Sequence, residues 1–349
     1  AQAISSLPIV LAYVRDLACA RGLSSFAEGE RRTMRRSLEI DTGQEQSTCH
    51  LRFVCLFVIW LARLEASVLT LVIPLIAKEF GCSIEIAAWV NFLPMFSNLM
   101  FSPSVGKFSD MYGHSKMWRS GFLLLVISTW LSAWSPSMPL LLIGRALTGF
   151  AMAGLFNPSL PLMTKGMDKE RRGIIQSYMS SVDALGSSVG VLAGGILIEH
   201  TTWRMIFFAP APLMTFMWLL SWFIVPKIAP TATNEVCGSP SKSRAAKFAK
   251  FDWLGTFLFA FMSLCLLFAI NRGNDLGWGS PMIAGLLGAS AISVPFLARI
   301  ERRSQHPILP IWLFFNRPRL LFTVIQAMTW SCYGSCFLLV PLYMQDALK

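Results

Sequence analysis

Nine runs of apolar residues, each long enough to cross a membrane as a helix, alternate with short polar gaps in this chain. A helix needs about 20 apolar residues to cross the ~30 Å hydrocarbon core of a bilayer. The runs lie at approximately 53–77, 85–106, 117–135, 138–163, 173–198, 204–226, 251–270, 281–298 and 320–345. They are apolar on every face, whereas the strands of a membrane barrel alternate in polarity. The sequence therefore predicts an all-α membrane protein.

Composition argues against the other broad classes. Apolar residues make up 54% of the 349 residues and charged residues only 14%, against about 25% charged in soluble domains. The net charge of +11 could suggest a nucleic-acid partner, but the basic residues are confined to the gaps, which is a pattern of membrane topology. The 8 Cys and 4 His are scattered along the sequence, so we expect no disulfide framework, metal site or cofactor.

The basic residues predict the orientation of the runs, because Lys and Arg concentrate in cytoplasmic loops. The loops after the second, fourth, sixth and eighth runs hold most of them, whereas the alternate loops hold only Lys78, Arg204 and Arg272. We therefore expect a cytosolic N-terminus. Residues 1–52 are expected to form a disordered cytosolic tail, and residues 227–250, rich in Ser, Ala, Lys and Pro, a flexible cytosolic linker.

Four charged residues stand well away from the ends of the runs: Arg63, Glu65, Arg145 and Asp183. A charge at the bilayer centre costs at least ~2.5–3.5 kcal/mol unless it is paired or hydrated. Their positions along the runs allow Glu65 and Arg145 to meet. A carboxylate beside a cation stays ionised, and desolvation favours proton uptake once a substrate displaces the cation. Glu65 and Arg145 are therefore candidates for proton coupling, with Asp183 as a substrate or proton site; structural ion pairing and packing are the alternatives.

The gap at 106–116 contains residues suited to a tight turn between antiparallel helices and to a latch at one end of the bundle. They are Gly106, Asp110, Gly113 and Lys116.

Small residues in the fifth run predict a face that another helix approaches closely, either as static packing or as a sliding surface. They are Gly186, Gly190, Gly194 and Gly195.

Four aromatic residues are candidates for cation–π contact with an organic cation, and packing in the core or against lipid is the alternative. They are Trp89, Phe92, Phe96 and Phe156.

These strings, in this order, resemble motifs of the major facilitator superfamily, and within it the fourteen-span drug:proton antiporter branch. Leu64-Glu65-Ala66-Ser67-Val68 resembles the first-span signature of that branch, usually L-D-x-T-I-V. Residues 106–116 are similar to the loop motif G-x-x-x-D-x-x-G-x-x-K, and residues 143–149 to the fourth-span arginine motif. Residues 186–195 are similar to the antiporter motif G-x-x-x-G-P-x-x-G-G. The resemblance covers roughly residues 53–349.

The resemblance implies a six-helix transporter half over 53–226, two inserted spans over 251–298, and a cytosolic loop with the first span of an incomplete second half over 299–349. It also implies proton-coupled export of small organic or cationic compounds by alternating access, with the proton gradient as the energy source. The expected partners are the lipid bilayer, a small organic substrate and protons. A monomer in the plasma membrane is expected, with the vacuole or another internal membrane as the alternative.

Three departures from the branch keep alternatives open. Glu65 stands where an Asp is usual, which keeps a titratable group but moves it outward by one methylene. Val191 takes the place of the antiporter-motif proline, so symport or facilitated transport is an alternative to exchange. The resemblance ends after nine spans instead of fourteen, which leaves a non-transporting fragment or scaffold remnant as a further alternative. An ATP-driven pump is disfavoured because the sequence has no G-x-x-x-x-G-K-[S/T] loop, and no clustered His, Cys or carboxylates indicate an enzyme.

Overall fold

The structure, a computed structural model, describes residues 24–165, 167, 169–225, 252–303, 317–329 and 331–332. For residues 24–48, 169–170, 274 and 302–303 it describes the backbone alone. Its helices are α3 (Ser24–Phe80), α4 (Ile84–Tyr112), α5 (His114–Ala133), α6 (Met138–Met163), α7 (Lys169–His200), α8 (Met205–Phe208), α9 (Pro210–Ile224), α11 (Trp253–Leu276) and α12 (Pro281–Arg303). Residues 317–329 and 331–332 are also helical. The described part of the chain contains no strand, which agrees with the all-α prediction.

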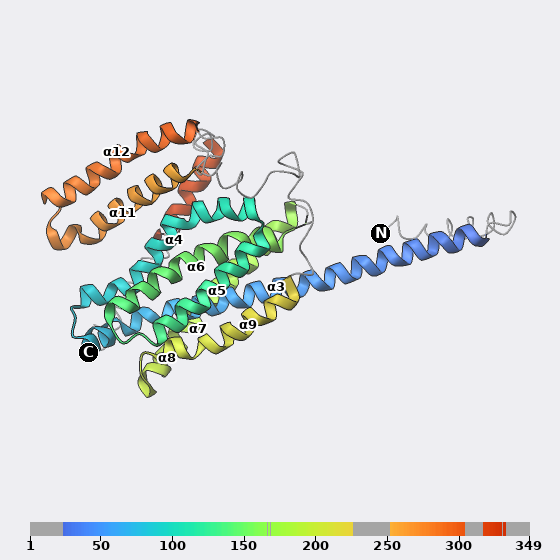
Figure 1. Cartoon of the computed structure of the whole chain (residues 1–349), viewed down its shortest axis with the longest axis horizontal. Coiled ribbons are helices and arrows are strands. Elements are labelled where there is room, and N and C mark those ends of the chain that lie inside the picture. The colour runs from blue at the N-terminus through green and yellow to red at the C-terminus, as the bar shows by residue number, and fades with distance from the viewer. Residues whose placement is uncertain are drawn as a thin grey trace.

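Helices α3 to α9 pack side by side in one bundle, and α11 and α12 form an antiparallel pair beside α4 (Figure 1). Among the described residues, seven segments are long and apolar enough to cross a membrane. They comprise the membrane part of α3, then α4, α6, α7, the α8–α9 segment, α11 and α12. Helix α5 is not among these seven, because Lys116, Arg119 and several Ser and Thr residues lower its mean hydropathy, but it packs along α6 as the expected third span.

Two expected polar segments have different outcomes. The disordered tail expected over 1–52 is wrong for residues 24–52, which belong to the same continuous helix as the first span and extend beyond the bundle (Figure 1). This segment is rich in Glu and Arg, which favour the helix, and extending an existing helix is easier than nucleating a new one. Residues 1–23 and the whole expected linker at 227–250 lie outside the described residues.

Glycines set the spacing of the helices in the bundle. A Cβ atom added to Gly190 of α7 would lie 2.6 Å from the carbonyl oxygen of Leu64 and 2.0 Å from Oγ of Ser67, both on α3. Gly121 of α5 and Gly154 of α6 meet backbone to backbone in the same way, with 2.5 Å from the added Cβ to a backbone carbon. Because these positions carry no side chain, the helices approach more closely than larger residues would allow.

The expected glycine face is correct for three of its four members. Gly186, Gly190 and Gly194 all lie against α3, since an added Cβ would meet atoms of α3 at 2.8 Å or less. The inclusion of Gly195 in this face is wrong, because nothing lies within 4 Å of a Cβ at that position. One residue turns a helix by about 100°, which places Gly195 off the stripe formed at intervals of four residues.

The interior of the bundle has two apolar clusters. One includes Val58 of α3, Phe122 of α5 and Leu155 of α6, and the other includes Val72 of α3 and Phe207 of α8. In α3, α5 and α6 the segments that contribute to the two clusters are separated by a short stretch with buried polar side chains. The bundle therefore contains a polar layer between two apolar ones.

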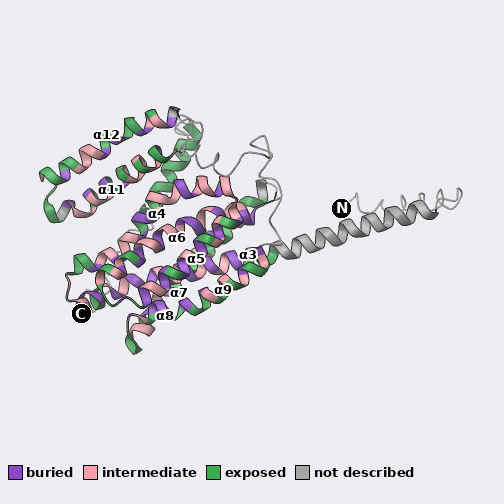
Figure 2. Cartoon of the chain, in the orientation of Figure 1, coloured by how far each residue is buried: buried purple, intermediate pink, exposed green. Residues whose placement is uncertain are grey.

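The outside of the bundle is largely apolar. Large exposed side chains such as Ile127, Leu192, Phe216 and Phe223 point away from it, and exposed positions recur along the outer faces of its helices (Figure 2). A soluble protein rarely exposes so much contiguous apolar surface, whereas lipid solvates it favourably. This surface agrees with an integral membrane protein that crosses the bilayer several times.

We expect the substitution Gly190→Ala to destabilise the bundle, because its methyl group would overlap Ser67 and the backbone of α3. Overpacking of this kind costs about 1–3 kcal/mol. The matched control is Gly195→Ala, which adds the same group to the same helix in open space. Thermal unfolding of the purified protein in detergent should show a lower Tm for Gly190→Ala only. Equal Tm values for the two variants would contradict the close α3–α7 contact.

Candidate functional site

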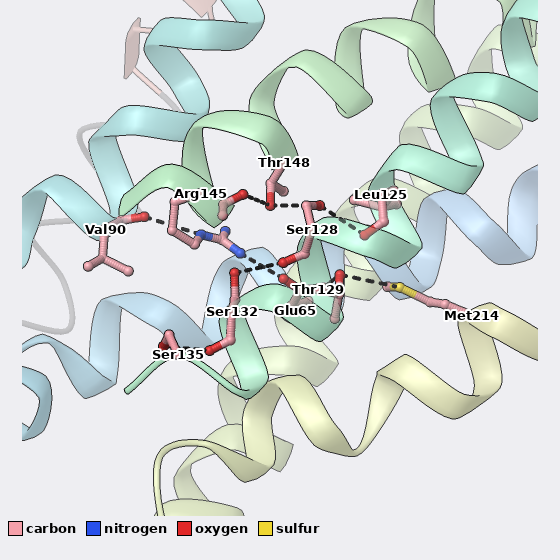
Figure 3. A network of polar contacts seen from close by, with 11 residues as sticks. Glu65, Val90, Leu125, Ser128, Thr129, Ser132, Ser135, Arg145, Thr148 and Met214 are labelled. Atoms are coloured by element: carbon pink, nitrogen blue, oxygen red, sulfur yellow. Dashed lines mark hydrogen bonds and ion pairs between the residues drawn. The ribbon is translucent and has the colours of Figure 1, made fainter. Parts of the chain in front are cut away.

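The polar layer is centred on an ion pair between Glu65 of α3 and Arg145 of α6 (Figure 3). Nη1 of Arg145 lies 2.8 Å from Oε1 of Glu65, and the side chains are only 1% and 2% exposed. The structure thus brings together the two residues expected to meet. Two charges this deeply buried need each other, because removal of either leaves an uncompensated charge in a medium of low dielectric constant.

The remaining polar atoms of the pair are bonded to neighbouring helices. Thr129 of α5 donates a hydrogen bond to Oε2 of Glu65 at 3.0 Å, and Nε of Arg145 donates to the carbonyl oxygen of Val90 on α4 at 3.4 Å. The guanidinium carbon of Arg145 lies 5.4 Å from the ring centroid of Phe207, within cation–π range. The pair therefore links α3, α4, α5, α6 and α8.

Hydroxyl groups extend the polar layer along α5 and α6. Thr148 donates to Oγ of Ser128 at 3.1 Å, and both residues are fully buried. Ser128 and Ser132 donate in turn to backbone carbonyls of their own helix. The sequence alone did not point to Thr129 or to the buried hydroxyls of Ser128, Ser132 and Thr148. A signal was present, because Ser128, Thr129 and Ser132 recur on one side of an otherwise apolar run.

Asp183 lies apart from this pair. Its Oδ1 accepts a hydrogen bond from Nε of Arg63, an ion pair that joins α7 to α3. Arg63 and Glu65 are two residues apart on α3, so their side chains point about 200° apart around the helix axis. The charged residues inside the membrane thus form two pairs on opposite sides of α3, and Asp183 does not share a site with Glu65 and Arg145.

A cavity of about 330 Å³ lies next to the Arg63–Asp183 pair. It is bounded by α3, α6, α7 and residues 326–329, and Phe156 of α6 contributes to its wall. The guanidinium carbon of Arg63 lies 5.6 Å from the ring centroid of Phe156. This cavity has both charged and apolar walls, as small-molecule sites usually have.

The other three aromatic candidates lie on α4, away from this cavity. The ring centroids of Trp89 and Phe96 are 5.6 Å apart in an edge-to-face arrangement, and Phe92 stacks on Phe96. Trp89 also contacts Phe268 of α11. In this structure, Trp89, Phe92 and Phe96 pack with one another and between α4 and α11, and a substrate contact by these residues stays a prediction.

The expected loop at 106–116 is almost entirely helical. Gly106 and Asp110 lie within α4, Lys116 lies within α5, and only Gly113 separates the two helices, with a positive φ of 98° that suits glycine. Asp110 and Lys116 are exposed. A latch role for these residues stays a prediction.

His114 lies at the same junction, outside the expected third span. Its Nδ1 lies 2.8 Å from Oγ of Ser109. Burial lowers the pKa of His114 below its ordinary value because it disfavours the imidazolium, while the negative charge of Asp110 opposes this shift. A largely neutral imidazole at neutral pH therefore adds no charge to this turn.

A polar cluster that the sequence analysis missed holds the opposite end of the bundle together. Glu79, at the end of α3, accepts hydrogen bonds from the indole of Trp203 and the guanidinium of Arg204. Arg204 also donates to the carbonyl oxygen of Ser135 at 3.2 Å. The end of α3 is thereby joined to the loop between α5 and α6 and to the loop between α7 and α8. The signal in the sequence was the presence of Arg204 and Glu79 in gaps that otherwise hold few charged residues.

These features define a class: an integral membrane protein with several spans, a helical bundle, and one buried and one partly exposed ion pair between its helices. Among the described residues, no group of three or more His, Cys, Asp or Glu side chains is placed to hold a metal ion. The sequence model of the Major Facilitator Superfamily matches residues 55–349. The chain belongs to this superfamily.

Two similar relatives are named as exporters or resistance proteins. The chain is 25% identical to "Multidrug resistance protein 3" of Bacillus subtilis over 313 residues, which cover 88% of this chain and 57% of the relative. It is 25% identical to the "Multidrug export protein EmrB" of Haemophilus influenzae, over 81% of this chain and 53% of the relative. The chain spans about half the length of the curated relatives it matches.

A similar solved structure is that of a bacterial homolog of the human lysosomal transporter Spinster, in an inward-facing and unoccupied conformation. The TM-score is 0.43 and the sequence identity 17%, with 72% of this chain and 60% of that chain covered.

We expect Arg145→Met to destabilise the protein strongly, because it leaves the Glu65 carboxylate buried without its counter-charge. Breaking a buried pair in this way costs about 3–5 kcal/mol. The double variant Glu65→Gln with Arg145→Met should recover most of this loss, since it removes both charges. Unfolding of the purified variants in detergent provides the measurement.

The matched control for this experiment is Arg272→Met, which breaks the more exposed pair between Arg272 and Asp275 on α11. Exposed pairs contribute at most about 1 kcal/mol, so this variant should stay close to the unsubstituted protein. If Arg145→Met were as stable as Arg272→Met, Glu65 and Arg145 would not be an obligatory pair.

Proposed function

We propose that this chain is the N-terminal part of a secondary active transporter that exports small organic compounds in exchange for protons. The observation that carries the proposal is the fully buried Glu65–Arg145 pair inside a bundle of the Major Facilitator Superfamily. A titratable carboxylate in lipid is costly unless it is paired, and such groups commonly mark ion and proton pathways. Glu65 is the proposed proton carrier and Arg145 its charge partner.

The geometry supplies a mechanism for the coupling. While Glu65 is ionised, it holds Arg145 through Oε1 and accepts from Thr129 through Oε2. Protonation neutralises the carboxyl group and leaves the guanidinium buried without a counter-charge, which favours a rearrangement of α6 relative to α3. A change in protonation thereby shifts the balance between two arrangements of the helices, as alternating access requires.

The names of the relatives support small organic compounds as the substrates, since one is called a multidrug resistance protein and another a multidrug export protein. Phe156 and Arg63 line the cavity next to the bundle core, where an amphipathic compound fits. The proposal extends to the whole transporter, of which this chain matches about half in those relatives.

The orientation follows from the basic loops and is part of the proposal. The N-terminus and the turn at Gly113 lie on the cytosolic side, and Gly106, Asp110 and Lys116 contribute there to a gate. The cluster of Glu79, Trp203 and Arg204 lies on the opposite side of the membrane. The transporter acts as a monomer in the plasma membrane, with the proton gradient as its energy source and no bound cofactor.

The test uses the protein reconstituted in vesicles with an acidic interior, in which proton efflux drives the uptake of substrate. Three aromatic probes are followed: phenethylamine, phenylalanine and 3-phenylpropanoate. We expect gradient-driven uptake of at least one probe. Glu65→Gln should reduce the gradient-driven component about tenfold or more, in line with coupling energies of 1–3 kcal/mol between linked sites. Glu65→Asp should retain it, because the titratable group remains.

Glu85→Gln provides the control, since Glu85 is an exposed carboxylate in the first turn of α4 and lies outside the proposed pathway. This variant should behave like the unsubstituted protein. Uptake driven only by an acidic exterior would indicate symport in place of exchange. If the gradient drives no probe, or if Glu65→Gln keeps the full response, the proposal is wrong.

A further inference from the structure

The cavity beside α3 carries two unlike charges that the proton mechanism does not use. Its wall is formed by residues of α3, α6, α7 and the helical segment at 317–329. They are Ile59, Arg63, Phe156, Gln176, Met179, Ser180, Asp183, Ala184, Gln326 and Thr329. One region of this wall is therefore charged, and apolar side chains stand next to it.

The ion pair in this wall leaves much of its bonding capacity unused. Nε of Arg63 donates to Oδ1 of Asp183, and within the described residues neither side chain makes another hydrogen bond. The two terminal nitrogens of the guanidinium and Oδ2 of the carboxylate thus have open bonding positions. The Arg63 side chain is 33% exposed and the Asp183 side chain 16%, so both are accessible, unlike Glu65 and Arg145.

The balance of charge selects the ligand. The Arg63–Asp183 pair is neutral as a whole, so a ligand with a single charge would add an uncompensated charge to a region of low dielectric constant. A ligand without charge would leave the open donors and the open acceptor unmatched. A zwitterion avoids both costs, because its carboxylate binds the guanidinium nitrogens, its ammonium binds Oδ2, and the site stays neutral.

The geometry also limits the shape of the ligand. Because Arg63 and Asp183 are in direct contact, the two charged groups of the ligand have to lie only a few bonds apart. Ile59, Met179 and Phe156 provide an apolar wall for the remainder of the molecule. A volume of about 330 Å³ is at the lower end of cavities that hold small organic ligands.

We propose that this cavity binds small amphipathic zwitterions, with a carboxylate and an ammonium close together on an aromatic or aliphatic body. The proposal rests on the proposed function, since it names the substrate class of that transporter. It assigns Arg63 to the carboxylate of the ligand and Asp183 to its ammonium.

The test measures binding to the purified chain in lipid nanodiscs without any proton gradient, by equilibrium dialysis of labelled probes. The three probes share one aromatic ring: phenylalanine is zwitterionic, phenethylamine is cationic and 3-phenylpropanoate is anionic. We expect phenylalanine to bind about tenfold more tightly than either singly charged probe, because it gains one additional charged hydrogen bond. Equal or tighter binding of a singly charged probe, or no binding of phenylalanine, would overturn the proposal.

Two variants separate recognition from structural support. Arg63→Gln removes the cation, so preference should pass to phenethylamine, while Asp183→Asn removes the anion, so preference should pass to 3-phenylpropanoate. An ion pair that only holds α3 to α7 would weaken the binding of all three probes alike in both variants. That uniform loss would contradict the proposal.

Arg272→Gln serves as the matched control, since it breaks a pair on α11 far along the chain from the cavity residues, and it should leave the preference unchanged. The outcome is independent of proton coupling. A zwitterion preference without gradient-driven transport would refute the proposed function alone, and gradient-driven transport without this preference would refute the zwitterion site alone.

Discussion

The burial of one carboxylate and one guanidinium in the centre of the bundle is the constraint on which the rest of the arrangement depends. Glu65 and Arg145 have lost almost all contact with solvent, so the protein itself has to replace their hydration. Thr129 of α5 donates a hydrogen bond to Glu65, and the carbonyl oxygen of Val90 on α4 accepts one from Arg145. The apolar clusters above and below exclude other partners, so these helices have to keep their relative positions for as long as the pair is charged.

Helix α3 carries one residue of each ion pair in the proposed mechanism. Glu65 and Arg63 lie on opposite sides of it, so one side contacts α6 through Arg145 and the other contacts α7 through Asp183. A displacement of α3 that relieves one pair necessarily changes the geometry of the other. In the proposed transporter, this shared helix is the physical link between the proton site and the cavity, and no longer chain of contacts is needed to connect them.

The sequence predicts the spans well because length and hydropathy suffice to locate a helix in lipid, and it predicts the Glu65–Arg145 contact because few partners exist for a charge in that environment. It does not fix how each helix is rotated against its neighbours. The sequence pattern therefore places Gly195 on a face that it does not reach, and it names no partner for Asp183, which pairs with Arg63 in the structure. The polarity of residues 24–52 favours disorder, but helix propensity is independent of polarity, and Glu and Arg are good helix formers.

The ion pair between Arg63 and Asp183 helps to set how α3 and α7 are aligned along their lengths. Gly186, Gly190 and Gly194 recur every four residues, and each faces a residue of α3. A shift of about one helical turn would bring Ser67 from Gly190 onto Gly194 or Gly186, which also lack a side chain. The glycine stripe alone therefore permits several registers. Asp183 is a single charge that only one register places against Arg63, so the ion pair selects the register that the glycines leave open.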